Sequence, residues 1–396
     1  MNKKLIYAAF FLAAISFSHT AVAQSSTTNL PTYKIAIFAP LYLDSVFDEN
    51  NTLRLKQGIP KFINPGLEFI HGAQVALDSM HLSGENVDAY IYDSKSTSKS
   101  IPDLIDNKDL DNIDLIIGSV KDIELKQLAD FAFTQKIPFV SATYPNDGGI
   151  TSNPYFIIPN STLKSHCEAI YSFVFQTHGG DKVFLCRKKG SQEDKVAAYF
   201  KNINEPDGKP LVNIQTINFD SSISKQLLLN KLDSNRQTVI IGGSLDENFA
   251  ANLANLSKSL SKVYSITLIG MPNWENFNSL YKKDAYKDFP IYFTSPYFND
   301  KTDNYSNILK NAFSKRYKGK PTDMAYKGFE TVYLFTKLLT RHPDDFMEHL
   351  NDTTDKVFND FNFKPISLKK SKTPDYIENK HVYFIQILNG VLSKAW

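Results

Sequence analysis

Residues 113–145 constrain the fold more than any other part of the chain, because they combine two apolar strands with one amphipathic helix. Residues 113–117 form an apolar run that only Asp114 interrupts, and residues 137–140 form a second one. Between them, residues 124–135 carry apolar side chains at helical spacing. This order is typical of a βαβ unit, in which parallel strands are buried on both faces. The pattern predicts an α/β protein.

The loops after these two strands are the first place where a ligand site is expected, because open α/β sheets bind ligands at the carboxyl ends of parallel strands. Ser119 follows the first strand, and Ser141, Ala142, Thr143 and Tyr144 follow the second. Hydroxyls and the N–H groups of helix starts suit a carboxylate or another polar oxygen. Serine is also a common helix cap, and capping explains Ser119 equally well.

The first 23 residues predict export as a signal peptide. Two lysines precede an apolar stretch at residues 5–17, and residues 21–23 (Ala-Val-Ala) supply the small-x-small cleavage pattern before Gln24. No later run approaches the roughly 20 apolar residues that a spanning helix needs. A periplasmic or secreted mature protein is therefore expected.

The charge balance argues against nucleic acid and acidic membranes as partners. Of the 44 basic residues, Lys3 and Lys4 lie in the expected leader, and the remaining ones equal the 42 acidic residues in number. A chain without net charge lacks the electrostatic attraction that such surfaces require.

The length predicts two lobes, because about 370 mature residues exceed the size at which a single core stops growing. The expected alternation of strands and helices restarts after a turn-rich segment at residues 145–154. The expected strands are 33–38, 87–92, 155–158, 182–187, 212–218, 238–241, 265–269, 290–294 and 382–388, and the expected helices are 67–80, 101–107, 163–176, 192–202, 225–233, 246–260, 305–317 and 322–340. Two consecutive doubly wound parallel sheets are implied.

The two cysteines leave two interpretations open. Cys167 is expected near the start of a helix and Cys186 near the end of the next strand, which places them side by side. In an oxidising compartment this arrangement allows a disulfide. Two buried free thiols explain the residues equally well, because cysteine packs well in cores.

Enzymatic motifs are not found. The chain has no Gly-x-Ser-x-Gly elbow, no Gly-x-x-x-x-Gly-Lys phosphate loop and no His-Glu-x-x-His pair. Its 8 histidines are scattered singly, so no metal cluster and no cofactor are predicted. A hydrolase or transferase built from two α/β lobes is the least favoured interpretation.

Several longer motifs carry a resemblance to a known family. They are FIHGAQVALDSM at residues 69–80, DLIIGS at 114–119, IPFVSATYP at 137–145, NPYFIIPNS at 153–161 and KPTDMAYKGFETVYLFTKLL at 320–339. Over nearly all of the mature length, the chain resembles the type 1 periplasmic binding proteins, in particular the branched-chain amino-acid receptors of ABC transporters. Such proteins bind a small molecule between two lobes and close by hinge motion.

The resemblance implies that the chain crosses between the lobes three times. The crossings are expected near residues 146–153, near Lys287 and near His342. The first lobe would then comprise residues 32–148 and 288–342, and the second lobe residues 149–287 and 343–396.

The resemblance also adds residues to the expected ligand-binding site. Ser244, Asn273 and Trp274 follow strands of the second lobe, Tyr297 follows a strand expected in the first lobe, and Tyr326 lies on the helix that faces the cleft in the family. Trp274 and Tyr326 are also readily explained as packing residues.

One loop departs from the family pattern. The resembled receptors carry a run of hydroxyl residues after the third strand, whereas this chain has Ser119-Val120-Lys121-Asp122. The resemblance therefore implies a small polar solute without identifying it as an α-amino acid.

The sequence thus predicts an exported solute-binding protein for uptake or sensing, with a membrane transporter or a cell-envelope protein as its partner. The alternative is an interaction protein of the same fold, such as a regulator of cell-wall synthesis. An open cleft lined by polar residues favours the first, and a cleft plugged by apolar side chains beside an apolar outer patch favours the second.

Overall fold

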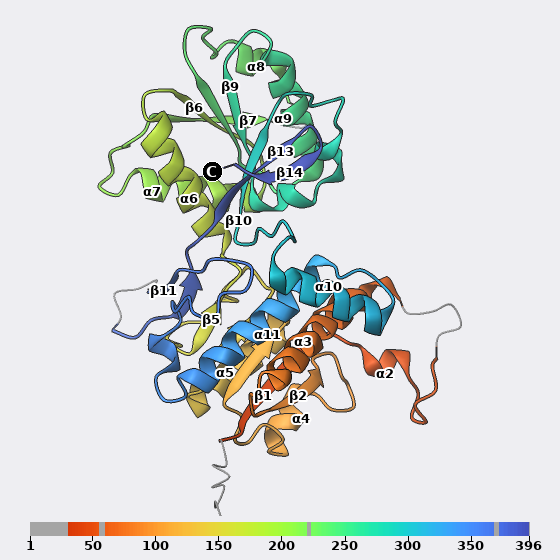
Figure 1. Ribbon diagram of the computed structural model, residues 1–396. Helices are drawn as coiled ribbons and strands as arrows, with labels where there is room; N and C mark the ends of the chain where they lie inside the picture. Colours follow the sequence, from red (N-terminus) through yellow and green to blue (C-terminus); the bar gives the residue numbers. More distant parts are fainter. Residues whose placement is uncertain (1–30, 55–59, 220–222, 368–371, 396) are drawn as a thin grey trace, which may run out of the picture. The chain divides into compact units, whose positions relative to one another are not determined.

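The computed structural model describes residues 31–54, 60–219, 223–367 and 372–395, which form two seven-stranded sheets with flanking helices (Figure 1). The expected leader, with its cleavage point before Gln24, lies outside the described residues. Within the described ranges, no helix combines the length and the apolar character that a membrane span requires.

The first sheet has the strand order β11-β12-β5-β4-β3-β1-β2. Its strands are β1 (Tyr33–Ala39), β2 (Val87–Asp93), β3 (Leu115–Gly118), β4 (Phe139–Ser141), β5 (Phe156–Ile158), β11 (Phe363–Ile366) and β12 (Tyr376–Asn379). All neighbouring strands are parallel except β11, which runs antiparallel to β12. The predicted βαβ unit is confirmed, with α5 (Asp122–Gln135) between the parallel strands β3 and β4.

Alternation along β1 divides the first lobe into two cores. Ile35 and Ile37 pack on one face of the sheet, and Ala36 and Phe38 pack on the other. The first face is covered by α3 (Asn64–Leu82), α10 (Asn304–Tyr317) and α11 (Asp323–Arg341), and the second by α4 (Ile101–Asp106) and α5. Figure 1 shows α3, α10 and α11 side by side.

Two glycines allow α3 and α11 to pack in close contact. A Cβ atom at Gly72 would lie 1.9 Å from the carbonyl oxygen of Ala325, and one at Gly328 would lie 2.0 Å from that of Phe69. Any side chain at either position would push the helices apart. This contact fixes the position of α11, whose first half carries residues of the candidate site.

The second sheet has the strand order β14-β13-β10-β9-β8-β6-β7. Its strands are β6 (Lys182–Lys188), β7 (Ile214–Phe219), β8 (Thr238–Gly242), β9 (Ile266–Ile269), β10 (Ile291–Ser295), β13 (Tyr383–Leu388) and β14 (Val391–Lys394). Its helices are α6 (Leu163–His178), α7 (Ser191–Asn204), α8 (Lys225–Leu229) and α9 (Glu247–Leu260). Only β13 runs antiparallel to its neighbours, β10 and β14.

Short helices occupy the connecting segments of both lobes. They are α2 (Leu43–Val46), η1 (Lys61–Ile63), η2 (Pro272–Asn276), η3 (Asn278–Tyr281) and η4 (Phe346–Glu348).

Cys167 and Cys186 lie in the core of the second lobe as buried free thiols. Burial raises the pKa of both thiols, which keeps them protonated and unreactive. Of the two interpretations that the sequence left open, the structure has the pair of thiols.

The sheets exchange strands at other positions than the sequence suggested. β5 belongs to the first sheet, β10 to the second, and the tail strands β11 and β12 return to the first. The chain therefore changes sheets after β5, after β10 and after β12, later than the expected positions near residues 146–153, Lys287 and His342. Tyr297 accordingly follows a strand of the second sheet and not of the first.

Candidate functional site

A cavity of about 690 Å³ is lined by loops and helix ends from both lobes. Its walls come from the segment after β5, the starts of α6 and α7, η2, the segment after β10, the first half of α11 and the loop before β11. The polar side chains that line it are Asn146, Asn160, Ser161, His166, Gln192, Asn273, Glu275, Asn276, Ser295, Tyr297, Asn299, Lys301, Asp323, Tyr326, Lys327, Glu330 and Asn359. This volume is in the range of small-molecule sites.

Lys327 and Glu275 give the cavity groups of opposite charge. Lys327 comes from α11 and Glu275 from η2, and both are half-buried. Burial lowers the pKa of the Lys327 ammonium, whereas the charges of Glu275, Asp323 and Glu330 oppose this shift. Burial raises the pKa of Glu275, and Lys327 and the Ser295 hydroxyl favour its ionised form. The two charges therefore stabilise each other in a partly desolvated space.

Aromatic rings support the lysines of this wall. The Nζ atom of Lys327 lies 4.4 Å from the centre of the Tyr297 ring, and that of Lys301 lies 4.9 Å from the centre of the Tyr326 ring. Lys301 also pairs with the exposed Asp323 at 2.9 Å. Such cation–π contacts hold an ammonium group in place without neutralising its charge.

Glu330 holds the part of the wall that is formed by Phe358 and Asn359, in the loop before β11. Its Oε1 atom accepts hydrogen bonds from the backbone N–H groups of Phe358 (3.0 Å) and Asn359 (2.7 Å), and its Oε2 atom accepts one from the Asn359 amide at 2.7 Å. Burial raises the pKa of this carboxyl to about 7, although these hydrogen bonds favour the ionised form. Glu330 thus ties the loop before β11 to α11.

His166 brings a neutral imidazole to the cavity. The ring is buried, and its Nδ1 atom lies 2.7 Å from the hydroxyl of Thr294. Burial lowers its pKa to about 3, and the nearby charge of Lys380 adds to this effect. A hydrogen bond to the backbone of Ser161 opposes this shift, and the imidazole is uncharged at neutral pH.

Three of the residues predicted from the sequence line the cavity, namely Asn273, Tyr297 and Tyr326. The amide of Asn273 donates to the carbonyl of Leu245 at 2.8 Å, and the Tyr297 hydroxyl donates to the carbonyl of Ala142 at 3.3 Å. The ring of Tyr326 is buried against Phe358. Their participation in ligand binding stays a prediction.

The predicted strand-end residues of the first sheet lie outside the cavity lining. The hydroxyls of Ser119 and Thr143 are 3.0 Å apart and bond to each other. Ser141 and Ala142 are fully buried, and Tyr144 packs against the core that contains α5. Within this group, the hydroxyls of Ser119 and Thr143 are engaged with each other and that of Ser141 is buried, and a role of the group in ligand binding stays a prediction.

Ser244 and Trp274 are also placed in the interior. The Trp274 ring is fully buried, because Gly242 and Gly270 leave room for it, and its indole N–H donates to the carbonyl of Ser244 at 2.9 Å. The Ser244 hydroxyl donates to Glu193 at 2.6 Å. The packing explanation that the sequence allowed for Trp274 therefore describes its position.

Sequence reasoning missed the charged residues of the wall, Lys327, Glu275 and Glu330, as well as His166. One signal was available, because Lys327 and Glu330 lie three positions apart on one face of α11, a helix in which most residues are buried. Charged residues on a helix face that packs in the interior are rare without a specific partner.

The chain was compared with protein-family models, curated proteins and solved structures. The family model described as periplasmic binding protein matches residues 66–387. A search of the curated proteins found no match to the chain.

Solved structures agree with the family model. A putative branched-chain amino acid ABC transporter protein from Rhodospirillum rubrum is 12% identical, with a TM-score of 0.64 over 92% of this chain and 100% of that one. A branched chain amino acid ABC transporter periplasmic ligand-binding protein from Burkholderia xenovorans is 13% identical, with a TM-score of 0.57 over 89% and 90%. A branched-chain amino acid transporter substrate binding protein from Streptococcus pneumoniae, in complex with isoleucine, is 16% identical, with a TM-score of 0.51 over 92% and 98%. The shared feature is the fold of two lobes.

Proposed function

Because the chain belongs to the periplasmic binding protein family, we propose that it is exported and binds a small polar solute in the cavity, for uptake or sensing. The observation that carries this proposal is that Lys327 and Glu275, which have opposite charges and influence each other's pKa, both line a cavity of about 690 Å³. A cavity lined in this way favours solute binding over a cleft filled by apolar side chains. The residues perform no catalysis in this proposal.

The charges of the wall define the class of solute. Lys327 would bind an anionic group such as a carboxylate, Glu275 would bind a cationic group, and the rings of Tyr297 and Tyr326 would cover an apolar part. Amino acids and related zwitterions have these features. The similar structure from Streptococcus pneumoniae contains isoleucine, and this supports amino acids as the first solutes to examine.

The anchor for the anion differs from the one expected from the sequence. The hydroxyls of Ser119 and Thr143 bond to each other, so a carboxylate in the cavity would rely on Lys327. If the solute is taken up, its delivery requires a membrane transporter as partner.

Native mass spectrometry of protein purified without refolding tests the proposal directly. A co-purified small molecule is expected, and calorimetry with that molecule and a panel of amino acids gives its affinity. Lys327→Met and Glu275→Gln should each weaken binding about tenfold to a hundredfold, because each removes one charge-assisted contact in a desolvated site.

Lys315→Met is the matched control, because Lys315 is an exposed lysine of α10 outside the cavity lining. Its affinity should equal that of the parent. The proposal fails if no solute binds, or if the two cavity variants bind as tightly as the control.

A second candidate, a protein that grips a cell-envelope partner, is favoured by one observation. The segment that precedes α3 exposes Leu43, Phe47, Leu53 and Phe62, whose side chains are between 37% and 57% accessible. Exposed apolar side chains in one segment are typical of protein contact surfaces. If the protein binds an envelope partner, replacing Leu53 and Phe62 by serine should abolish capture of that partner. If it binds a solute, the same variant should keep the solute affinity of the parent.

A further inference from the structure

The loop after α11 gathers two histidines and an aspartate, His342, Asp345 and His349, away from the cavity lining. One nitrogen or oxygen atom from each lies within 4.8 Å of those of the others. The imidazole rings of His342 and His349 are stacked with their centres 3.6 Å apart. The two oxygens of Asp345 lie near different rings: Oδ1 is 3.5 Å from Nδ1 of His342, and Oδ2 is 3.0 Å from Nε2 of His349.

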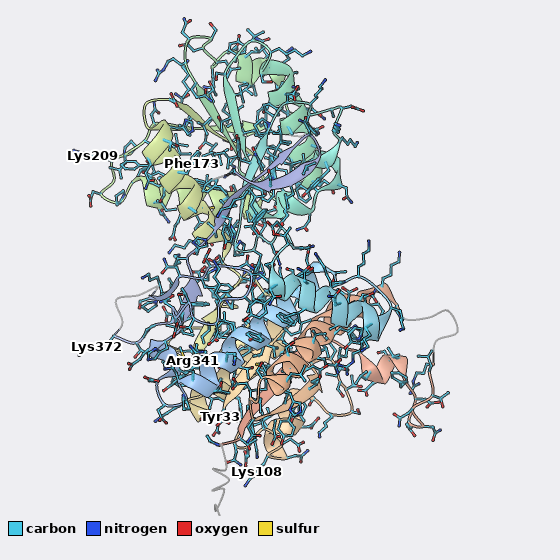
Figure 2. The ribbon with its side chains drawn as sticks, in the orientation of Figure 1. Tyr33, Lys108, Phe173, Lys209, Arg341 and Lys372 are labelled. Atoms are coloured by element: carbon cyan, nitrogen blue, oxygen red, sulfur yellow. The ribbon has the colours of Figure 1, made fainter. Side chains whose placement is uncertain are left out.

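The backbone and two buried side chains hold this loop in place. His342 follows α11 directly, next to Arg341, which Figure 2 labels. Asp345 precedes η4, and the N–H of His349 donates to the carbonyl of Phe346 at 3.2 Å. Phe346 and Leu350 are buried in the core of the first lobe. The three side chains therefore project from a segment that packing has already ordered.

Asp352 is placed to orient the ring of His342. Its Oδ1 atom accepts the N–H of Thr354 at 2.8 Å, and its Oδ2 atom lies 3.7 Å from Nε2 of His342. That nitrogen is buried and has no hydrogen-bond partner among the described residues. The separation of 3.7 Å is longer than a hydrogen bond, so the ring would have to move closer for Nε2 to donate to Asp352, and Nδ1 would then keep a free lone pair on the side of Asp345. Histidines that bind metals are commonly oriented by a carboxylate in this way.

We propose that His342 Nδ1, His349 Nε2 and the Asp345 carboxylate bind a transition-metal ion, with Zn²⁺ as the ion to test and Asp352 as a positioning residue. In a tetrahedral zinc site with bonds of about 2.0–2.1 Å, neighbouring ligand atoms are about 3.4 Å apart. One Asp345 oxygen lies 3.0 Å from Nε2 of His349, close to this spacing, and the other lies 3.5 Å from Nδ1 of His342. Because the two rings are stacked, the partly exposed His349 ring would turn so that both nitrogens point at the ion. Two imidazoles favour zinc-like ions over Mg²⁺ and Ca²⁺, which prefer oxygen ligands.

The accessibility of the cluster defines the kind of site. The side chains of Asp345 and His349 are 47% and 36% exposed, so water can occupy a fourth position and the ion can exchange. The cluster is separate from the solute cavity, because fifteen residues of helix and cap between Lys327 and His342 correspond to about 22 Å. Bound metal would brace the start of the loop whose other end is tied to Glu330.

Zinc titration of the mature chain, purified without a polyhistidine tag and treated with a chelator, tests this site. Calorimetry should give one saturable Zn²⁺ site, and Mg²⁺ in excess should not compete. Co²⁺ should produce the visible absorption of a low-coordinate ion. His349→Ala and Asp345→Asn should remove this site, and Asp352→Asn should weaken it about 10-fold to 100-fold.

The pair of His178 and Asp181 is a matched control in the second lobe, because it has the same His-x-x-Asp spacing and a contact of 2.8 Å but no second histidine. His178→Ala should leave zinc affinity unchanged. Circular dichroism and melting of each metal-free variant establish that it is folded, and His349→Gln provides a variant of similar size. The proposal is overturned if the parent shows no saturable site, if Mg²⁺ competes equally, or if the folded His349 variants bind zinc like the His178 variant.

Discussion

The strand ends of the first sheet and the wall formed by α11 carry similar polar groups but differ in where those groups find their partners. At the strand ends, Ser119 bonds to Thr143, and the carbonyl of Thr143 accepts the amide of Asn160 at 2.7 Å. At the wall, the ammonium group of Lys327 lies over the ring of Tyr297. The carboxylates of Glu275, Asp323 and Glu330 favour its charged form.

This difference explains why the strand-end hydroxyls are assigned a structural role and the charged residues of the wall are assigned to ligand binding. A polar group whose hydrogen bonds are completed inside the protein contributes to stability, and a ligand would have to break those bonds first. A buried charge without a direct ion pair gains free energy when a complementary ligand arrives. The position of a serine after a parallel strand therefore does not suffice to assign it to a site.

The largest expected effect within the wall concerns Glu330, which accepts three hydrogen bonds from Phe358 and Asn359. Glu330→Ala leaves these donors without an acceptor in the interior. We expect a loss of about 3 kcal/mol in the free energy of unfolding, measured by urea denaturation at pH 7.

Glu348→Ala is the control for Glu330, because Glu348 is an exposed glutamate of the same lobe, and it should change stability by less than about 0.5 kcal/mol. Equal stability of the two variants would contradict the assigned role of Glu330 in holding the wall.

The comparison also explains how much of the fold the sequence could predict. Strands such as β1 and helices such as α11 were predicted within a few residues, because periodicity is a local property of the chain. The sheet membership of β5, β10, β11 and β12 was not, because the pattern of a short apolar strand does not say which neighbouring strands it pairs with.

The candidate site was predictable only in part for the same reason. Rules for strand ends pointed to Ser119 and Ser141, but side-chain direction and local pairing decide whether a hydroxyl is available. Lys327 and Glu275 come from elements far apart in the sequence, and only the tertiary structure brings their charges together. His342 and His349 seemed isolated because the turn at η4 that stacks their rings has no simple period.

A smaller, pH-dependent effect is expected from His166. Its folded pKa of about 3 lies below the ordinary value of 6.5, so the unfolded chain binds the proton more tightly. The contribution of this imidazole to stability is therefore complete above pH 6.5 and is lost as the pH falls toward 3. At pH 5 the loss should be about 2 kcal/mol.

His166→Gln isolates this contribution, because glutamine can still bond to Thr294 but does not titrate. The difference in unfolding free energy between parent and variant should change by about 2 kcal/mol between pH 7 and pH 5 in ligand-free protein. A difference that is constant over this range would contradict a buried, neutral His166.

A still smaller effect is expected at the strand ends from the bond between Ser119 and Thr143. Each single variant, Ser119→Ala and Thr143→Val, should lower stability by about 1 kcal/mol, and the double variant should lower it by less than the sum, because both remove the same hydrogen bond. Solute affinity should stay at the level of the parent. A loss of affinity in both single variants without a change in melting would return these hydroxyls to the ligand site.

The smallest effect is expected at Ser141, and it gives the strictest test of the comparison. Its hydroxyl is fully buried and has no hydrogen-bond partner among the described residues. Removing an unsatisfied buried hydroxyl relieves a desolvation cost, so Ser141→Ala should leave stability within about 0.5 kcal/mol of the parent or increase it. Calorimetry with the co-purified solute should give an unchanged affinity. If Ser141→Ala instead loses about tenfold in affinity while it melts normally, its hydroxyl bonds to the solute, and the strand ends belong to the binding site after all.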